Sequence, residues 1–121
     1  MPTRFAILHH KLADGEHWDL MLEHGDALLT WQLEREPVDA AALPIPAKRI
    51  GDHRKAYLEY EGPVSGDRGH VRRVDAGLVE FERLAADEVV FRLKGERLAG
   101  AFVLRARGYA WRFDQDDTSR M

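Results

Sequence analysis

The 121-residue sequence predicts an all-β domain, a small closed or nearly closed β-barrel of about eight strands with little helix. Several segments alternate apolar and polar residues with period two, which is the strand pattern. Glycine-containing turns punctuate the second half, and no segment of helical length shows a 3.6-residue apolar period. Short strands at even spacing are typical of β-sandwiches and small barrels.

The first strands are expected near the N-terminus, where an apolar run ends at His9 and His10. The next segment, EHWDLMLE, alternates along residues 16–23. One of its faces would carry Trp18, Leu20 and Leu22, and the other would carry His17, Asp19, Met21 and Glu23. The turn HGD at residues 24–26 leads into ALLTWQL, which predicts a hairpin.

The remaining elements are expected to be a long connection followed by short strands. Residues 34–50 contain three prolines and predict a connection with a helical turn around residues 38–43. Beyond it, the strand-like runs are AYLEYEG, HVRRVD, LVEFERL, EVVFRLKG, RLAGAFVLRARG and YAWRFD, with DAG among the turns between them. Trp31, Trp111 and Phe113 are expected in the core, and residues 114–121 in a frayed tail.

Length and composition limit the possible classes of protein. A chain of this size predicts one domain over residues 1–121. The absence of cysteine excludes disulfides and thiolate metal sites, so any metal would be held by histidine and carboxylate. The apolar run near the N-terminus is too short for a signal sequence or a membrane span, so we expect a cytoplasmic protein with no membrane partner.

The charge distribution is uneven. The net charge of -3 argues against general electrostatic binding of nucleic acid. Residues 1–47 hold three Lys/Arg and eight Asp/Glu, whereas residues 48–73 hold seven Lys/Arg and four Asp/Glu. Acidic ligands near a cation and basic side chains near an anion would produce this asymmetry, although patchy charge on a solvated surface is the commoner cause.

His17 and Asp19 form the first candidate site, because period two places both side chains on one strand face, about 7 Å apart at their Cα atoms. A mixed imidazole and carboxylate set suits Zn, Mn or Fe, whereas Mg and Ca prefer oxygen ligands. A third ligand would come from His10 or His9 on the preceding strand. The alternative is a solvated, hydrogen-bonded pair without a metal.

A second interpretation of the same segment is a cupin. GEHWDLMLEHG has the outline of a first cupin motif, with His17, Asp19 and Glu23 as ligands. The second motif requires Pro-x-Gly, a histidine and an asparagine, but GPVSGDRGHVRRV spaces its proline and glycine one position too far apart, and Val74 replaces the asparagine. This interpretation would make the protein a metal oxygenase or isomerase acting on a small molecule.

Taken in order, the motifs resemble the 3'-phosphoesterase domain of bacterial DNA ligase D, and most closely its small stand-alone relatives. The resemblance covers roughly residues 4–113. It rests on His10, the run HWDLMLE at 17–23, DHRKAY at 52–57, YEG at 60–62, GDRG at 66–69, VDAG at 74–77 and LKGERLAG at 93–100. The combination in sequence order is more specific than any of these motifs alone.

The resemblance implies a β-barrel hydrolase that trims 3' ends of DNA or DNA-RNA strands with Mn2+, removing a terminal ribonucleotide and then the 3'-phosphate. It implies DNA repair, with nucleic-acid 3' ends and DNA end-joining proteins as partners. The metal ligands would be His10, His17 and Asp19, with Zn2+ or another divalent transition metal as substitutes for manganese. His53 and Tyr57 would hold the phosphate and serve catalysis.

Three departures from the family pattern affect the expected activity. Met21 replaces an arginine that contacts phosphate, and losing that contact would cost about 2 to 4 kcal/mol of transition-state stabilisation. The gap from His10 to His17 is one residue longer than usual, which keeps His9 as a rival ligand. The connection before His53 is shorter than in the family, so the second arginine that binds phosphate would be Arg49, with Arg54 or Arg68 as substitutes. A catalytically weakened module that binds nucleic-acid ends or another phosphorylated ligand is therefore an alternative function.

Overall fold

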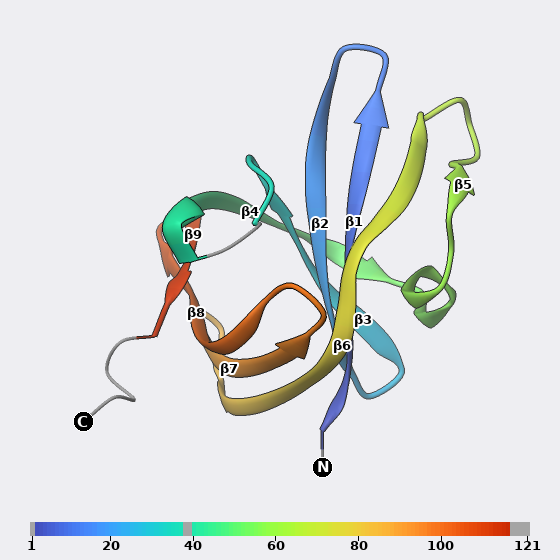
Figure 1. Ribbon diagram of the computed structural model, residues 1–121. Helices are drawn as coiled ribbons and strands as arrows, with labels where there is room; N and C mark the ends of the chain where they lie inside the picture. The colour runs from blue at the N-terminus through green and yellow to red at the C-terminus, as the bar shows by residue number, and fades with distance from the viewer. Residues whose placement is uncertain (1, 38–39, 117–121) are drawn as a thin grey trace.

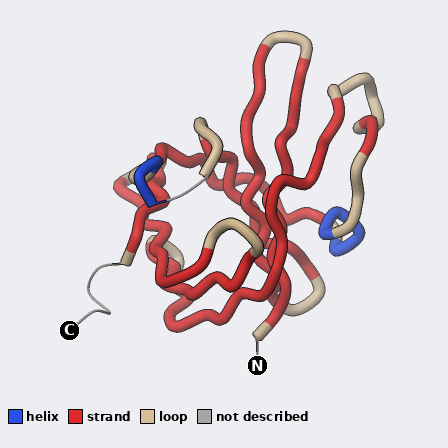
Figure 2. The backbone as a smooth tube through the Cα atoms, viewed as in Figure 1, coloured by secondary structure: helices blue, strands red, loops and turns tan. Residues whose placement is uncertain are grey.

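The structure, a computed structural model, describes residues 2–37 and 40–116. Strands dominate these residues, and the helices are short 3-10 turns (Figures 1 and 2). None of the described helices has the length and apolar character that a membrane crossing requires. The elements are β1 Thr3–Leu12, β2 Gly15–His24, β3 Ala27–Leu33, η1 Ala40–Ala42, β4 Ile45–His53, η2 Lys55–Leu58, β5 Gly62–Pro63, β6 His70–Leu84, β7 Glu88–Gly95, β8 Ala99–Arg107 and β9 Ala110–Gln115.

Eight of the strands close into an antiparallel barrel, which confirms the predicted fold class. The strand order is β1-β2-β3-β4-β9-β8-β7-β6, and β6 pairs back onto β1. The two-residue β5 lies outside this ring and adds to β6 alone. Because β1 pairs with β2 on one side and β6 on the other, the histidines near its C-terminal end have partners on both sides.

The barrel interior holds the larger apolar core. Leu20 and Leu22 of β2 point inward, as their alternation predicts, and Trp31 and Phe113 are completely buried. Trp111 packs against the same cluster, and the rings of Phe91, Phe102 and Phe113 stack at 5.3–6.3 Å between centroids. Trp31, Trp111 and Phe113 therefore contribute to the core, as predicted.

A second apolar cluster lies on the outside of the barrel. Met21 is on the opposite face of β2 from Leu20, yet it too is completely buried. Leu58 of η2 belongs to this outer cluster and Tyr57 packs against it. In Figure 1, η2 and β5 lie beside β1 and β6 and outside the ring. The other buried members of the outer cluster are Ala6, Leu8, Leu28 and Val71.

The expected turn at DAG, residues 75–77, is wrong, because β6 runs through it without a break. Gly77 pairs with Gly95, and a Cβ at Gly77 would lie 2.1 Å from the carbonyl oxygen of Lys94. The buried carboxylate of Asp75 accepts four backbone N–H bonds, which are donated by Ala76, Glu96, Arg97 and Leu98 at 2.9–3.1 Å. These residues therefore serve close packing and loop anchoring rather than a turn.

Three other expectations need correction. AYLEYEG was expected as a strand, but residues 55–58 form η2, because the adjacent side chains of Tyr57 and Leu58 both pack against the barrel. The connection expected over residues 34–50 ends earlier, since β4 begins at Ile45. The expected tail begins later, because Asp114 and Gln115 pair with β8 in β9. Residues 117–121 of that tail, and residues 38–39 of the expected helical turn, lie outside the described residues, while η1 follows at 40–42.

The anchoring role of Asp75 leads to a stability prediction. Asp75→Asn removes the charge and one acceptor oxygen, so we expect the free energy of unfolding to fall by about 2 to 3 kcal/mol. Urea denaturation measures the change. Asp14→Asn, at an exposed position in the β1–β2 turn, is the matched control and should change stability by less than about 0.5 kcal/mol. Equal stability of the two variants would contradict the anchoring role.

Candidate metal centre

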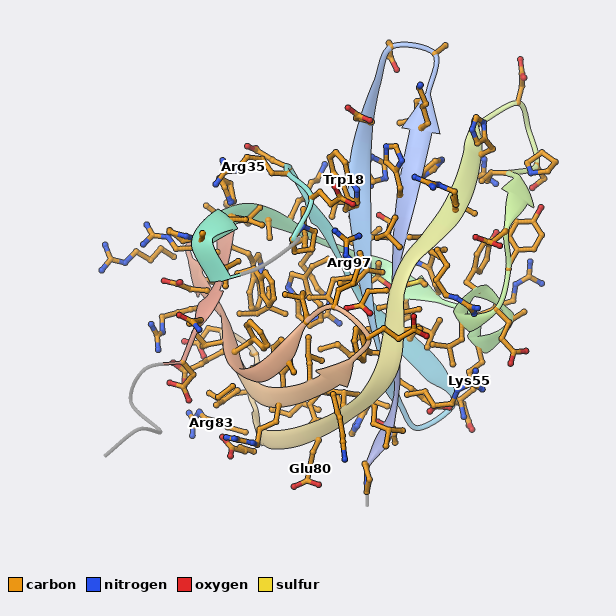
Figure 3. All side chains as sticks on the ribbon, in the orientation of Figure 1. Trp18, Arg35, Lys55, Glu80, Arg83 and Arg97 are labelled. Carbon is orange, nitrogen blue, oxygen red and sulfur yellow. The ribbon has the colours of Figure 1, made fainter. Side chains whose placement is uncertain are left out.

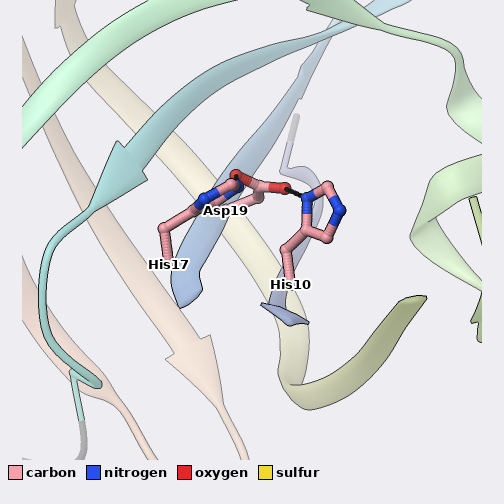
Figure 4. Close-up of side chains that lie close together, drawn as sticks. All are labelled: His10, His17 and Asp19. Atoms are coloured by element: carbon pink, nitrogen blue, oxygen red, sulfur yellow. Dashed lines mark ion pairs between the residues drawn. The ribbon is translucent and has the colours of Figure 1, made fainter. Parts of the chain in front are cut away.

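Three of the predicted ligands meet on the outer face of β1 and β2. His10 lies opposite His17, and Leu8 lies opposite Asp19, so the pairing of two strands brings the three side chains together. One ligand atom of each lies within 4.8 Å of the others. Asp19 is central: its Oδ1 is 3.2 Å from His17 Nε2, and its Oδ2 is 3.7 Å from His10 Nδ1 (Figure 4).

Two polar atoms of the cluster are buried without a hydrogen-bond partner. These atoms are His17 Nε2 and Asp19 Oδ1, which are close but lack hydrogen-bond geometry. Leaving a buried polar group unsatisfied costs about 1 to 3 kcal/mol. A cation shared by both atoms would remove this cost, and two imidazoles with one carboxylate suit Mn or Zn. The residues present therefore fit a divalent transition metal.

The second ring nitrogen of His10 has a hydrogen-bond partner that sets the tautomer of the ring. Nε2 of His10 is 2.7 Å from the backbone carbonyl oxygen of Arg68. Because a carbonyl oxygen only accepts, Nε2 donates, and the lone pair of the neutral ring resides on Nδ1, which faces Asp19. Metal-ligating histidines commonly hold their other nitrogen in this way, and the contact sets the tautomer and the ring orientation.

The loop that supplies this carbonyl is held tightly against β1. Gly69 has φ of +75°, and a Cβ there would lie 2.0 Å from the carbonyl oxygen of Lys11. The Val64 N–H donates to the Gly69 carbonyl oxygen at 2.8 Å across the loop. Sequence reasoning missed the role of this backbone, although the spacing of glycines in SGDRG is a signal for a close approach.

His9, the rival ligand, lies on the other face of β1. Its ring stacks on Trp18 with centroids 4.8 Å apart, and its Nε2 lies 2.6 Å from Glu16 Oε1. Trp18 packs against the interior core. Of the two candidate histidines, the structure therefore brings His10 and not His9 to Asp19.

Glu23, the additional ligand of the cupin interpretation, is not part of the cluster. Its Oε1 accepts a hydrogen bond from the Arg4 backbone N–H at 2.9 Å, and its Oε2 is 3.2 Å from Lys55 Nζ. These contacts tie η2 to the barrel and hold the pKa of Glu23 below its ordinary value, chiefly through the Arg4 N–H and then through Lys55. The geometry does not support a cupin site.

His53 and Tyr57 form a second group on the same outer face. Their rings meet edge to face with centroids 5.4 Å apart. Nδ1 of His53 donates to the Gly51 carbonyl oxygen at 3.1 Å, which leaves Nε2 as the other polar atom of the ring. Tyr57, which was expected on a strand, lines a hollow of about 220 Å³ with Arg54, Ala56 and Tyr60. Lys55, labelled in Figure 3, projects from the same turn.

The two groups are separated along the sheet. His53 pairs with Leu28 on β3, while the cross-strand partner of Glu23 is also Leu28. Glu23 is four residues from Asp19, so the row of His53 lies roughly 13 Å along the strands from the row of Asp19. Met21 and its cross-strand partner Ala6, both of the outer cluster, lie between them on the same face. A ligand that contacts both groups would have to extend over this cluster.

The three candidate phosphate-binding arginines occupy different environments. Arg54 is exposed beside Tyr57 in the hollow. The guanidinium of Arg49 lies over the Trp31 ring at 4.4 Å and contacts Asp52 at 3.5 Å, so it shares the inner face of the sheet. The guanidinium of Arg68 is bound to the carbonyl and hydroxyl oxygens of Ser65. Only Arg54 of these three lies with Tyr57.

Comparison with known proteins assigns the chain to a family. Residues 8–106 match the model of the DNA Ligase D 3'-phosphoesterase domain. The chain belongs to this family. Membership confirms the resemblance found in the sequence, and it supports a phosphoesterase of DNA repair rather than a cupin.

Curated relatives include mycobacterial proteins that are much longer than this chain. The chain is 30% identical over 115 residues to the multifunctional non-homologous end joining DNA repair protein LigD of Mycobacterium tuberculosis (strain CDC 1551 / Oshkosh). It shows the same identity to the multifunctional non-homologous end joining protein LigD of Mycobacterium bovis (strain ATCC BAA-935 / AF2122/97). The match covers 88% of this chain and 15% of each mycobacterial protein.

The placement of the two neighbouring histidines predicts different metal affinities. His10→Ala should weaken Mn2+ binding by more than about 100-fold, because it removes a ligand rather than a supporting contact. His9→Ala is the matched control and should bind Mn2+ within about 3-fold of the unsubstituted protein. Isothermal titration calorimetry measures both affinities, and thermal unfolding checks that both variants fold. The reverse order of affinities would make His9 the ligand.

The environment of Glu23 predicts a pH dependence of stability. Because its pKa is lowered in the folded state, Glu23 contributes stability above its ordinary pKa of 4.5, and this contribution is lost as pH falls through the folded-state value. At pH 7, Glu23→Gln should reduce the free energy of unfolding by about 1 kcal/mol. Below the folded-state pKa the difference should vanish. Urea denaturation at pH 7 and at a series of lower pH values measures it, and a difference that stays constant as pH falls would contradict the prediction.

Proposed function

We propose that the chain is a Mn2+-dependent 3'-phosphoesterase that trims 3' ends of DNA or DNA-RNA strands during end-joining repair. The observation that carries the proposal is the cluster of His10, His17 and Asp19, with two buried ligand atoms that have no hydrogen-bond partner. Family membership supports the reaction class. The metal, the substrate and the end-joining partners are parts of the proposal.

The roles of the side chains follow from their contacts. When bound, the metal supplies a Lewis acid that polarises a phosphoryl oxygen and acidifies a water. Asp19 holds one oxygen toward each histidine, and the Arg68 carbonyl oxygen retains the proton of His10 on Nε2. His53, whose Nδ1 donates to Gly51, has Nε2 left to contact a phosphate of the strand other than the one at the metal centre, because the two groups are separated along the sheet. Tyr57 packs against the His53 ring and limits its orientations.

A weakened enzyme that mainly binds ends is the second candidate, and the burial of Met21 favours it. Met21 is completely buried beneath η2, so it contacts no substrate. The exposed Arg54 is the candidate arginine that remains near Tyr57. Without a guanidinium at position 21, the transition state would lose one charge-assisted contact, which lowers the rate by roughly two to three decades.

Metal-dependent phosphate release distinguishes the two functions. With Mn2+, the purified protein should release inorganic phosphate from a 3'-phosphorylated DNA oligonucleotide, and EDTA should stop the release. His17→Ala removes a ligand and Asp19→Asn replaces a charged ligand with a neutral one, so each should lower the rate by at least about 100-fold. His24→Ala, an exposed histidine at the end of β2, is the control and should retain the rate.

The binding function predicts a different result. The protein would then bind the 3'-phosphorylated oligonucleotide more tightly than its 3'-hydroxyl counterpart, but it would release no phosphate with Mn2+ or Zn2+. Fluorescence anisotropy with both labelled oligonucleotides measures this preference. Equal affinity for the two ends, together with no release, would contradict both proposed functions.

A further inference from the structure

A larger hollow lies elsewhere on the barrel, on the outer face of β8 and β9. It encloses about 430 Å³. In β8 and β9, Leu104 and Phe113 point into the core, so the intervening side chains of both strands face outward. The hollow is lined by Pro46, Val103, Arg105, Arg107, Ala110, Trp111, Arg112 and Asp114.

The charge of this hollow is predominantly positive. Arg105 and Arg112 are directly opposite each other across β8 and β9, an arrangement in which like charges destabilise a sheet. Glu88 pairs with Arg105 at 2.8 Å, but Arg107 and Arg112 form no ion pair among residues 2–37 and 40–116. Asp114 also lines the hollow, and its Oδ1 accepts from the Gln115 N–H. An external anion would offset the repulsion between the arginines.

An exposed aromatic ring lies at the end of the same hairpin. Tyr109 follows Gly108 in the turn between β8 and β9, and its relative exposure of 101% is that of a free side chain. Full exposure leaves both faces of the ring open to solvent. Arginines that hold phosphates beside an aromatic ring that stacks on a base are the combination by which proteins bind single strands without sequence preference.

The hollow lies in register with the metal centre around the outside of the barrel. Asp19 pairs with Gln32, and Gln32 pairs with Lys48, which is exposed on β4. Two residues along β4, Pro46 pairs with Arg112. With strands about 4.8 Å apart, β9 is about 14 Å around the sheet from β2. A strand of a few nucleotides would cover this distance from β9 to β2, and it would pass the exposed ammonium of Lys48 on β4.

We propose that the outer face of β8 and β9 binds single-stranded nucleic acid. Phosphates contact Arg107 and Arg112, and a base stacks on Tyr109. A duplex does not fit this description, because all its bases except those of the terminal pairs are stacked within the helix and expose no face to Tyr109. The surface extends the proposed function, in that the bound strand leads its 3' end to the metal centre; binding at this surface needs neither the metal nor turnover.

Metal-free binding tests the proposal. The probe is a 5'-fluorescein 12-nucleotide DNA strand with a 3'-hydroxyl end, titrated in EDTA and followed by fluorescence anisotropy. Arg112→Gln should weaken binding by about 5-fold at 0.1 M salt and make the salt slope of log K shallower by about 0.7, the effect of one lost phosphate contact. Tyr109→Ala should weaken binding by at least about 5-fold through lost stacking.

Arg92→Gln is the matched control, since it removes the same charge from an exposed, outward-facing position on β7 outside the hollow. It should leave affinity and salt slope unchanged. Equal losses for Arg92→Gln and Arg112→Gln would overturn the proposal, and so would tighter binding of a blunt 12-base-pair duplex.

The proposed function can fail independently of this surface. If the unsubstituted protein releases no phosphate from a 3'-phosphorylated strand, the metal-centre proposal fails. The difference in affinity between Arg112→Gln and Arg92→Gln then still decides the proposal for β8 and β9. Retained phosphate release with no difference between these two variants would reject the surface alone.

Discussion

The pairing of β1 with both β2 and β6 is the constraint on which the barrel and its site depend. It closes the ring of eight strands. On one side of β1, His17 lies opposite His10 and Asp19 lies opposite Leu8. On the other side, β6 follows directly from the loop whose Arg68 carbonyl holds the His10 ring. Closure therefore brings the candidate metal ligands together and supplies the contact that orients His10.

The same region of sheet is buried on both faces, which favours a fixed strand register. Leu20 and Leu22 fill the interior, while Met21 fills the outer cluster under η2. Burying a large apolar side chain contributes about 1.5 to 3 kcal/mol. The buried side chains on each face of β2 therefore both stabilise the pairing register of this strand. Asp19 lies at the edge of the outer cluster, where it is buried, although its Oδ1 has no hydrogen-bond partner.

The uneven charge along the chain has more than one role in the fold. Lys55 of the basic segment pairs with Glu23, and Arg4 pairs with Glu59, so some opposite charges fasten η2 to β1 and β2. Arg49 and Arg68 of the same segment also have partners within the protein. The arginines of β8 and β9 lie outside the segment whose positive charge suggested a phosphate site. Only the folded hairpin brings these arginines together.

The sequence by itself determined the barrel class and most of the first strands. Period-two alternation records which side of a strand faces the core, as it does for Leu20 and Trp31. It also indicated His17 and Asp19 as neighbours, because that relation is local to one strand. The family was evident from the order of its motifs.

Only the tertiary structure distinguished His10 from His9. The choice depends on which of the two side chains lies on the outer face of the barrel, where His17 and Asp19 lie. It also showed Met21 to be buried, because alternation assigns a face to a side chain but does not predict that a later segment, η2, covers that face. Asp75 and Gly77 resemble turn residues in sequence, yet they lie inside β6, where distant backbone approaches closely. Contacts between segments far apart in the chain leave no local pattern, and for this physical reason the structure decided them.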